Sequence, residues 1–142
     1  MDGGVPALHR AAGVKARVVT TPREARSEGG PRRGDIHWID LPNTGGHVIR
    51  GRRPVLVVQS DRLRRSSTVV VLPMTTSAKA ADFRPPFLVE ALGRQTGLRR
   101  DGWIKCDQPF TVPTAILGPR GGRLDPTALG RVDVALQFVF GI

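Results

Sequence analysis

Two short segments of the sequence place polar side chains that could do chemistry at one end of an apolar run. In residues 51–60, Arg53 comes directly before Pro54 and an apolar stretch. In residues 69–77, an apolar stretch leads to Thr75 and further hydroxyl side chains. If the two runs form neighbouring antiparallel strands, the start of one lies beside the end of the other. The sequence therefore predicts Arg53 beside Thr75 at a sheet edge, and a guanidinium next to a hydroxyl suits a phosphate ester.

The charge balance points to a polyanionic partner. The 142 residues include 22 Lys+Arg against 12 Asp+Glu, a formal net charge of +10, and only three of the basic residues are lysines. Arginine offers a planar fork that binds phosphate through two hydrogen bonds. We therefore expect a nucleic acid as the first candidate partner and an acidic protein as the second. A GC-rich genome that favours arginine codons would explain the same excess, and composition alone leaves both explanations open.

The length and the cysteine count favour one domain in a reducing compartment. A chain of 142 residues is of single-domain size and can bury a substantial core. Cys106 is the single cysteine, so no disulfide can form within the chain, and we interpret it as a packed side chain rather than a nucleophile. His9, His37 and His47 show no metal-ligand spacing, so we expect neither a metal nor a cofactor. No apolar stretch approaches the ~20 residues of a membrane span, and no signal-peptide core is visible, so we expect a cytoplasmic protein without a membrane contact.

Residues 1–33 differ in composition from the remainder of the chain. They contain seven basic and three acidic residues and several Gly and Pro, with no sustained periodicity. We expect a flexible basic N-terminal extension over residues 1–33 and a folded domain over residues 34–142. The extension would be either an overlong start assignment or a source of electrostatic affinity for RNA.

The sequence pattern of residues 34–142 predicts a mainly β domain with a C-terminal helix. Strands are expected at residues 35–41, 54–60, 68–73, 87–92, 103–106 and 110–112. The two continuous apolar runs indicate burial on both faces, as in a small barrel or half-barrel. Asp125 is a good helix N-cap, and Pro126 suits the first helical position. Leu129, Val132, Leu136 and Val139 recur at helical spacing and predict a helix packed on the barrel.

Each candidate residue also has an ordinary structural interpretation. An arginine before a strand is often a solvated strand end, and threonines after a strand often bond their own backbone. Trp38 alternates with Ile36, which favours a core or interface position over base stacking. Asp107 and Gln108 would either satisfy loop backbone groups or touch a base. Further basic residues would either line an RNA path or solubilise the surface: Arg62, Arg64, Arg65, Lys79 and Arg84.

Several segments together resemble the MazF/PemK family of toxin endoribonucleases. The likeness is carried by Gly34-Asp35, by Arg53-Pro54 and by the run from Pro73 to Thr75, each in its apolar context. In the family's order, the matching segments are residues 34–41, 51–58, 70–77, 96–98, 106–108 and 130–133. The match as a set spans residues 34–142.

The resemblance implies an SH3-like barrel of the MazF/PemK/CcdB type with a C-terminal α-helix, acting as a homodimer. It implies a type II toxin that cleaves single-stranded RNA at a short sequence by attack of the 2′-OH, without a metal. An acidic, partly disordered MazE-like antitoxin would cover the RNA groove. The family's catalytic arginine corresponds to Arg53 and its catalytic threonine to Thr75. RNA contacts would come from neighbouring residues: Asn43, Thr44, His47, Arg52, Thr76, Ser77, Lys79 and Gln108.

One departure from the family pattern concerns the loop before Arg53. Family members often carry a Glu-Gln pair there, whereas this chain has residues 47–50 with His47 followed by Val48. His47 is either an exposed loop residue or a replacement acid or base. Two alternatives stay open. One is a non-catalytic gyrase-binding barrel of the CcdB kind, which the presence of Arg53 and Thr75 disfavours. The other, suggested by the altered loop, is an inactive relative that binds an antitoxin or a nucleic acid.

Overall fold

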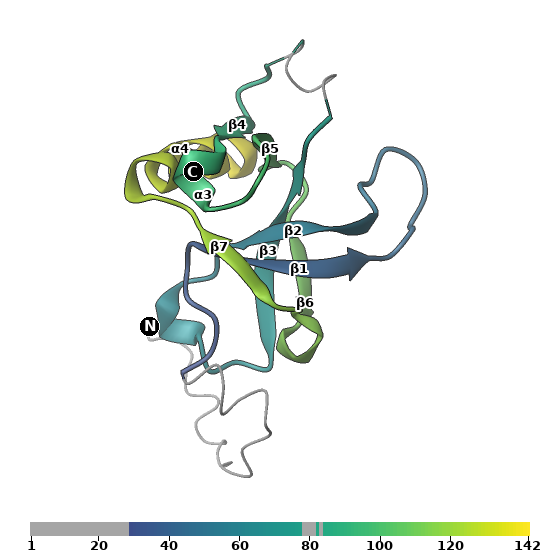
Figure 1. Cartoon of the computed structure of the whole chain (residues 1–142), viewed down its shortest axis with the longest axis vertical. Coiled ribbons are helices and arrows are strands. Elements are labelled where there is room, and N and C mark those ends of the chain that lie inside the picture. The colour runs from purple at the N-terminus through teal and green to yellow at the C-terminus, as the bar shows by residue number, and fades with distance from the viewer. Residues whose placement is uncertain (1–28, 78–81, 83) are drawn as a thin grey trace. The chain divides into compact units, whose positions relative to one another are not determined.

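The computed structural model describes residues 29–77, 82 and 84–142, and the chain divides into Met1–Gly30 and Pro31–Ile142. Within the described residues of the second unit, seven strands form one curled antiparallel sheet with a helix at the C-terminus (Figure 1). The strands are β1 (Asp35–Leu41), β2 (Gly51–Val57), β3 (Thr68–Thr75), β4 (Leu88–Ala91), β5 (Gly102–Lys105), β6 (Phe110–Pro113) and β7 (Arg120–Arg123). The helices are α3 (Gly93–Thr96) and α4 (Pro126–Phe140), with single 3₁₀ turns at η2 (Asp61–Leu63) and η3 (Thr114–Ile116).

Strand β3 is the centre of the sheet. The strand order is β4-β5-β3-β2-β1-β7, and β6 pairs with the first half of β3. The second half of β3 pairs with β5, with Met74 opposite Ile104. One long strand thus belongs to two parts of the sheet, and this is how the sheet curls into a half-barrel.

The curled sheet is buried on both faces. Leu56 and Leu72 belong to one core cluster, which packs against α4. Val55, Val57 and Val71 belong to a second cluster on the other face. Each fully buried aliphatic side chain contributes about 1.5–3 kcal/mol. The continuous apolar runs therefore form strands with two buried faces, as the sequence predicts.

Helix α4 begins and ends at residues suited to those positions. The Asp125 carboxylate accepts a hydrogen bond from the backbone N–H of Ala128 at 2.8 Å, and Pro126 is the first helical residue. Gly141 ends the helix in the left-handed conformation, with φ of 70°. The buried positions include Val132, and the partly buried ones include Leu129, Leu136 and Val139, so the predicted apolar face is the one that packs on the sheet.

The predicted fold class and order of elements are confirmed, while some bounds are wrong. The strand expected at residues 54–60 begins earlier, at Gly51, and ends at Val57. The segment expected as a turn, residues 93–101, contains the short helix α3. Strand β7 has the sequence RGGR, which carries no alternating apolar pattern, and it pairs with β1 through backbone hydrogen bonds.

Hydrogen bonds and an ion pair of Arg33 attach the segment just before β1 to the rest of the domain. Its backbone N–H donates to the Asp61 carboxylate at 2.8 Å, and its Nε donates to the carbonyl of Val58 at 3.0 Å. Its guanidinium also pairs with Asp133 on α4. The predicted boundary between an extension and a domain at residues 33/34 stays a prediction, because most of the extension lies outside the described residues.

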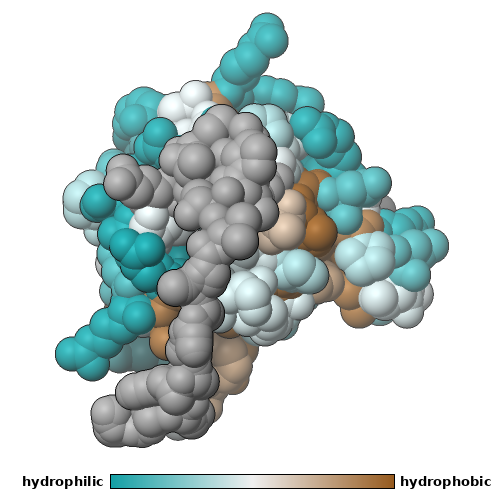
Figure 2. Space-filling view, turned by 90° about the horizontal axis from the view of Figure 1, so that it is seen from below, coloured by the Kyte–Doolittle hydropathy of each residue, from teal (hydrophilic) through white to brown (hydrophobic). Residues whose placement is uncertain are grey.

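Hydrophilic residues predominate on one face of the described residues (Figure 2). The face shown in Figure 2 is largely hydrophilic, with hydrophobic residues confined to small areas. The exposed large apolar side chains include Val134, Phe138 and Ile142 on and after α4. In the part of the chain that the structure describes, no helix has the length and apolar character needed to cross a bilayer.

We expect Gly122→Ala to destabilise the domain, because a Cβ at this position would meet the backbone carbonyl of Thr96. Relief of such an overlap requires a backbone shift and costs about 1–3 kcal/mol. The matched variant is Gly130→Ala on the exposed side of α4, where a Cβ would meet nothing within 4 Å. That variant should be more stable by about 0.5–1 kcal/mol. Urea unfolding measures both values, and equal stability of the two variants would contradict the close approach of β7 to α3.

Candidate active site

The side chain of Arg53 is held by backbone carbonyls. Its Nε donates to the carbonyl of Arg50 at 2.9 Å, and its Nη1 donates to the carbonyl of Met74 at 3.2 Å. Gly51 has a φ of 89°, which lets the chain turn from the preceding loop into β2. Loss of hydration on partial burial lowers the pKa of Arg53 from its ordinary value. An arginine nevertheless stays protonated at neutral pH, so the site keeps a fixed cation.

Thr75 lies beside Arg53, as the antiparallel arrangement predicts. Strand β2 pairs with β3 so that Val55 is opposite Pro73, and continuing this register brings Arg53 to Thr75. The Thr75 Oγ1 accepts a hydrogen bond from the backbone N–H of Ser77 at 3.1 Å. Because this bond uses an acceptor lone pair, the hydroxyl proton remains available to donate to a bound oxygen.

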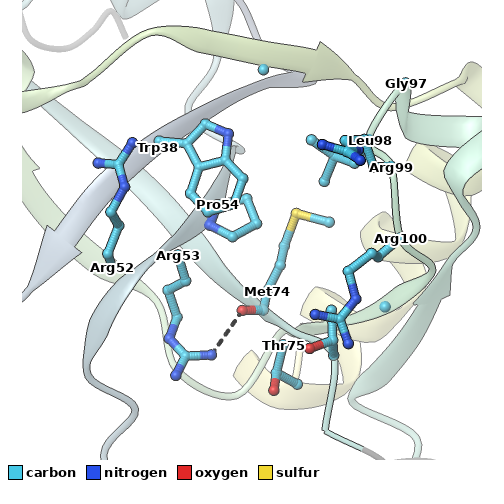
Figure 3. A pocket seen from close by; sticks show the side chains of 13 residues that line it. Trp38, Arg52, Arg53, Pro54, Met74, Thr75, Gly97, Leu98, Arg99 and Arg100 are labelled. Atoms are coloured by element: carbon cyan, nitrogen blue, oxygen red, sulfur yellow. Dashed lines mark hydrogen bonds between the residues drawn. The ribbon is translucent and has the colours of Figure 1, made fainter.

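Arg53 and Thr75 border a pocket of about 810 Å³ (Figure 3). Strands β2 and β3 supply one part of its lining, and the α3–β5 loop and β7 supply another. The lining residues are Trp38, Arg52, Arg53, Pro54, Met74, Thr75, Thr76, Gly97, Leu98, Arg99, Arg100, Gly102 and Gly121. These described residues include four arginines and two hydroxyls, and among them is no histidine, carboxylate or thiol, so this lining is suited to an anion.

Trp38 holds Arg52 at the rim of this pocket. The Arg52 guanidinium carbon lies 5.3 Å from the centre of the Trp38 ring. A cation over the face of an indole is attracted by the negative potential of the ring. Gly121 lies against the ring edge, where a Cβ would come within 2.7 Å of Nε1. Of the core or interface position expected for Trp38, the structure shows a half-buried side chain that lines the pocket, while an interface role stays a prediction.

Gln108 fastens the loop between β1 and β2. Its Oε1 accepts from the backbone N–H of Ile49 at 2.8 Å, and its Nε2 donates to the carbonyl of His47 at 3.1 Å. Of the two interpretations open for this residue, the structure shows the one in which it satisfies loop backbone groups. Since Arg53 is bonded to the carbonyl of Arg50 in the same loop, Gln108 also helps to position the guanidinium.

The structure brings together only part of the predicted site. Arg52, Arg53, Thr75 and Thr76 line the pocket. The other predicted contacts that the structure describes lie outside this lining: Asn43, Thr44, His47, Ser77 and Gln108. Lys79 lies outside the described residues.

Sequence reasoning did not select Arg99 and Arg100. The available signal was the group of three arginines in residues 93–101. It carried no information on which strand the segment would face, because this depends on the long-range pairing of β5 with β3.

The Cys106 thiol and the possible metal ligands lie outside the pocket lining. Burial, with a smaller contribution from the neighbouring Asp107 carboxylate, raises the pKa of Cys106 to about 12. The thiol is therefore protonated at neutral pH and packs in the core, as interpreted from the sequence. In the described residues, no three His, Cys, Asp or Glu side chains gather in a way that could hold a metal ion.

Comparison with known proteins gives consistent results for sequence and fold. Residues 32–140 match the family described as PemK-like, MazF-like toxin of type II toxin–antitoxin system. The chain is 35% identical over 107 residues to endoribonuclease EndoA of Bacillus subtilis, covering 75% of this chain and 90% of that protein. It is 37% identical over 114 residues to the probable endoribonuclease MazF of Mycolicibacterium smegmatis, covering 78% and 97%. A mycobacterial endoribonuclease solved in complex with its cognate antitoxin shares the fold, with a TM-score of 0.65, 23% identity, and coverage of 80% of this chain and 97% of that one.

We expect Gln108→Ala to loosen the β1–β2 loop. Losing a hydrogen bond of about 1 kcal/mol should speed hydrogen exchange at the Ile49 amide by roughly fivefold or more. Gln108→Glu is the matched variant, because a carboxylate still accepts from Ile49 while it no longer donates to His47. That variant should keep most of the protection at Ile49. NMR-detected exchange measures both, with the Leu92 amide, bonded to Gln95, as an internal control. Unchanged exchange at the Ile49 amide in Gln108→Ala would contradict the proposed role of Gln108 in holding the β1–β2 loop.

Proposed function

Because the chain belongs to the family of PemK-like, MazF-like toxins of type II toxin–antitoxin systems, we propose that it is the toxin of such a system and acts as an endoribonuclease. The proposed substrate is single-stranded RNA, cleaved at a short sequence in the cytoplasm. Relatives at 35% and 37% identity that bear endoribonuclease names support the activity.

The observation that carries the proposal is the contact between Arg53 and the strand end that bears Thr75. The Arg53 Nη1 donates to the carbonyl of Met74, one residue before Thr75, so the cation and the hydroxyl face the same pocket. A phosphodiester in this pocket would meet a fixed positive charge and a hydroxyl donor together. Such pre-positioned donors stabilise charge that develops in a transition state.

The proposed reaction is an attack of the ribose 2′-oxygen on the adjacent phosphorus. The 2′-OH loses its proton as the new P–O bond forms, and the bond to the 5′-oxygen breaks as that oxygen gains a proton. The products are a 2′,3′-cyclic phosphate and a 5′-hydroxyl. In this scheme Arg53 stabilises the charge on the phosphoryl oxygens, and Thr75 holds the phosphate or the 2′-OH in line.

The proposed partners follow from family membership and from charge. The mycobacterial neighbour was solved with its cognate antitoxin. A chain with a formal net charge of +10 and an arginine-lined pocket would attract an acidic MazE-like antitoxin. We also propose a homodimer. The exposed apolar side chains Val134, Phe138 and Ile142, which are 65%, 60% and 88% exposed, support an additional packing partner for this end of the domain.

We expect the purified protein to cleave single-stranded RNA in the presence of EDTA. Arg53→Ala and Thr75→Ala should each reduce kcat by about 100-fold or more, because each removes a donor to the developing charge. The control is Arg94→Gln, an exposed arginine on α3 outside the pocket lining, which should keep full activity. Gel analysis of cleaved RNA measures the rates, and thermal melting checks that the variants fold. Full cleavage by both variants would contradict this site, and no cleavage by the unaltered protein would favour the gyrase-binding or inactive alternatives.

We further propose that His47 supplies a proton transfer in this reaction. Among the described residues, the pocket lining contains no histidine, carboxylate or thiol, and His47 lies in the adjacent loop, where its carbonyl accepts a hydrogen bond from Gln108. Imidazoles titrate near neutral pH. His47→Ala should therefore lower kcat by about 100-fold and remove one inflection from the pH–rate profile. Val48→Ala, in the same exposed loop, should leave the profile unchanged. An unaltered profile in His47→Ala would rule out the role.

A further inference from the structure

We propose that Arg99 and Arg100 form a second phosphate subsite, which binds a backbone phosphate next to the one at Arg53 and Thr75. This inference rests on the proposed function, since it assigns a second contact to the same RNA. The α3–β5 loop would thus be a substrate-binding element of the domain.

The two arginine pairs border one pocket from different elements. Arg52 and Arg53 come from β2, whereas Arg99 and Arg100 come from the loop between α3 and β5. In the view of Figure 3, the two pairs lie on opposite sides of Met74 and Thr75. A strand of RNA placed with one phosphate at Arg53 would have to leave the pocket along its rim, where a neighbouring phosphate can meet the second pair.

The loop that carries Arg99 and Arg100 is fixed at both ends. At its start, the Thr96 Oγ1 accepts from the backbone N–H of Leu98 at 2.9 Å, and Thr96 is 1% exposed. At its end, Gly102 lies so close to β3 that a Cβ there would come within 2.7 Å of the Thr75 carbonyl. The backbone of the second subsite is therefore held directly against the strand that bears Thr75.

The guanidinium groups of Arg99 and Arg100 are available to a ligand. Within residues 29–77, 82 and 84–142, neither group has a hydrogen-bond or ion-pair partner, and both side chains are exposed. The carboxylate next in sequence, Asp101, accepts from the backbone N–H of Gly93 at 2.7 Å. Among the described residues, Asp101 thus helps to close the loop and forms no ion pair with Arg99 or Arg100.

A phosphate suits this subsite better than a base does. Arginine forks match phosphate oxygens in geometry and in charge. The pocket of about 810 Å³ offers room for more than the single phosphate that Arg53 and Thr75 would hold. Contacts to backbone phosphates position a nucleic acid without reading its sequence. The pair should therefore raise affinity for RNA without changing the rate of the bound complex.

The test is a binding and rate measurement on Arg99→Gln/Arg100→Gln, with Arg94→Gln as a control that removes one charge from the same segment outside the pocket lining. The probe for binding is a short fluorescein-labelled RNA that contains the mapped cleavage site, with a 2′-deoxy sugar at the cleaved position so that it stays intact. Because exposed ion pairs are worth up to about 1 kcal/mol each, the double variant should weaken Kd and raise KM by roughly 5- to 20-fold. Its kcat should remain within about twofold, as expected for uniform binding.

Two further measurements identify the ligand group. The plot of log K against log salt should be shallower by about 0.7 for the lost phosphate contact. Replacing one linkage next to the cleaved phosphate by an uncharged methylphosphonate should weaken binding to the unaltered protein and leave the double variant unaffected.

The outcomes separate this inference from the proposed function. If the unaltered protein cleaves RNA but the double variant binds like Arg94→Gln, the subsite is wrong and the proposed function stands. The subsite is also wrong if the double variant loses affinity for an acidic antitoxin peptide alone, or if no single methylphosphonate cancels the effect. If no RNA is cleaved or bound by the unaltered protein, the proposed function itself fails.

Discussion

The antiparallel register between β2 and β3 is the constraint on which the candidate site depends. It places Val55 opposite Pro73 and Leu56 opposite Leu72, and continuing it brings Arg53 to Thr75. A slip by one residue would move every side chain of a strand to the opposite face. Here both faces are buried, with Leu56 in one core cluster and Val55 in the other, so a slip would disrupt both clusters. The packing of aliphatic side chains therefore fixes the relative position of a guanidinium and a hydroxyl that take no part in that packing.

Several arginines of the described residues differ in the kind of group they contact. Arg33 pairs with Asp133, and Arg123 pairs with Asp35 at 2.6 Å. Two of the pocket arginines instead contact neutral groups: Arg53 donates to backbone carbonyls, and Arg52 lies over the Trp38 ring. A carboxylate partner would cancel the charge that an incoming anion needs, whereas a carbonyl dipole or a π face orients the cation and leaves its charge in place. The arrangement thus separates arginines that hold the fold from arginines that can bind a ligand.

The sequence predicted those parts of the structure that depend on local pattern. The apolar runs identified β2 and β3, the cap at Asp125 identified the start of α4, and the short connection between the two runs placed Arg53 beside Thr75. It did not predict β7, because the segment that forms it has no apolar alternation and is positioned by pairing with β1. It also did not place the α3–β5 loop on the pocket. That position follows from the pairing of Thr75 with Trp103 and from a glycine small enough for close approach, neither of which leaves a periodic signal.

The groups that line the pocket imply that phosphates and bases are recognised by different parts of the domain. Guanidiniums and hydroxyls suit phosphates, which are the same in every RNA, and such contacts position a strand without reading it. A preference for a particular cleavage sequence must then come from groups outside the lining that can reach base edges. The exposed β1–β2 loop, which carries Asn43, Thr44 and His47, is the polar segment joined directly to Arg53. Gln108 bonds to the backbone of His47 and Ile49, so it fixes the end of this loop that leads to Arg53. Because the proposed base contacts lie in this loop and the proposed phosphate contacts lie in the pocket lining, a substitution in the loop can change the bases read while the phosphate site stays the same.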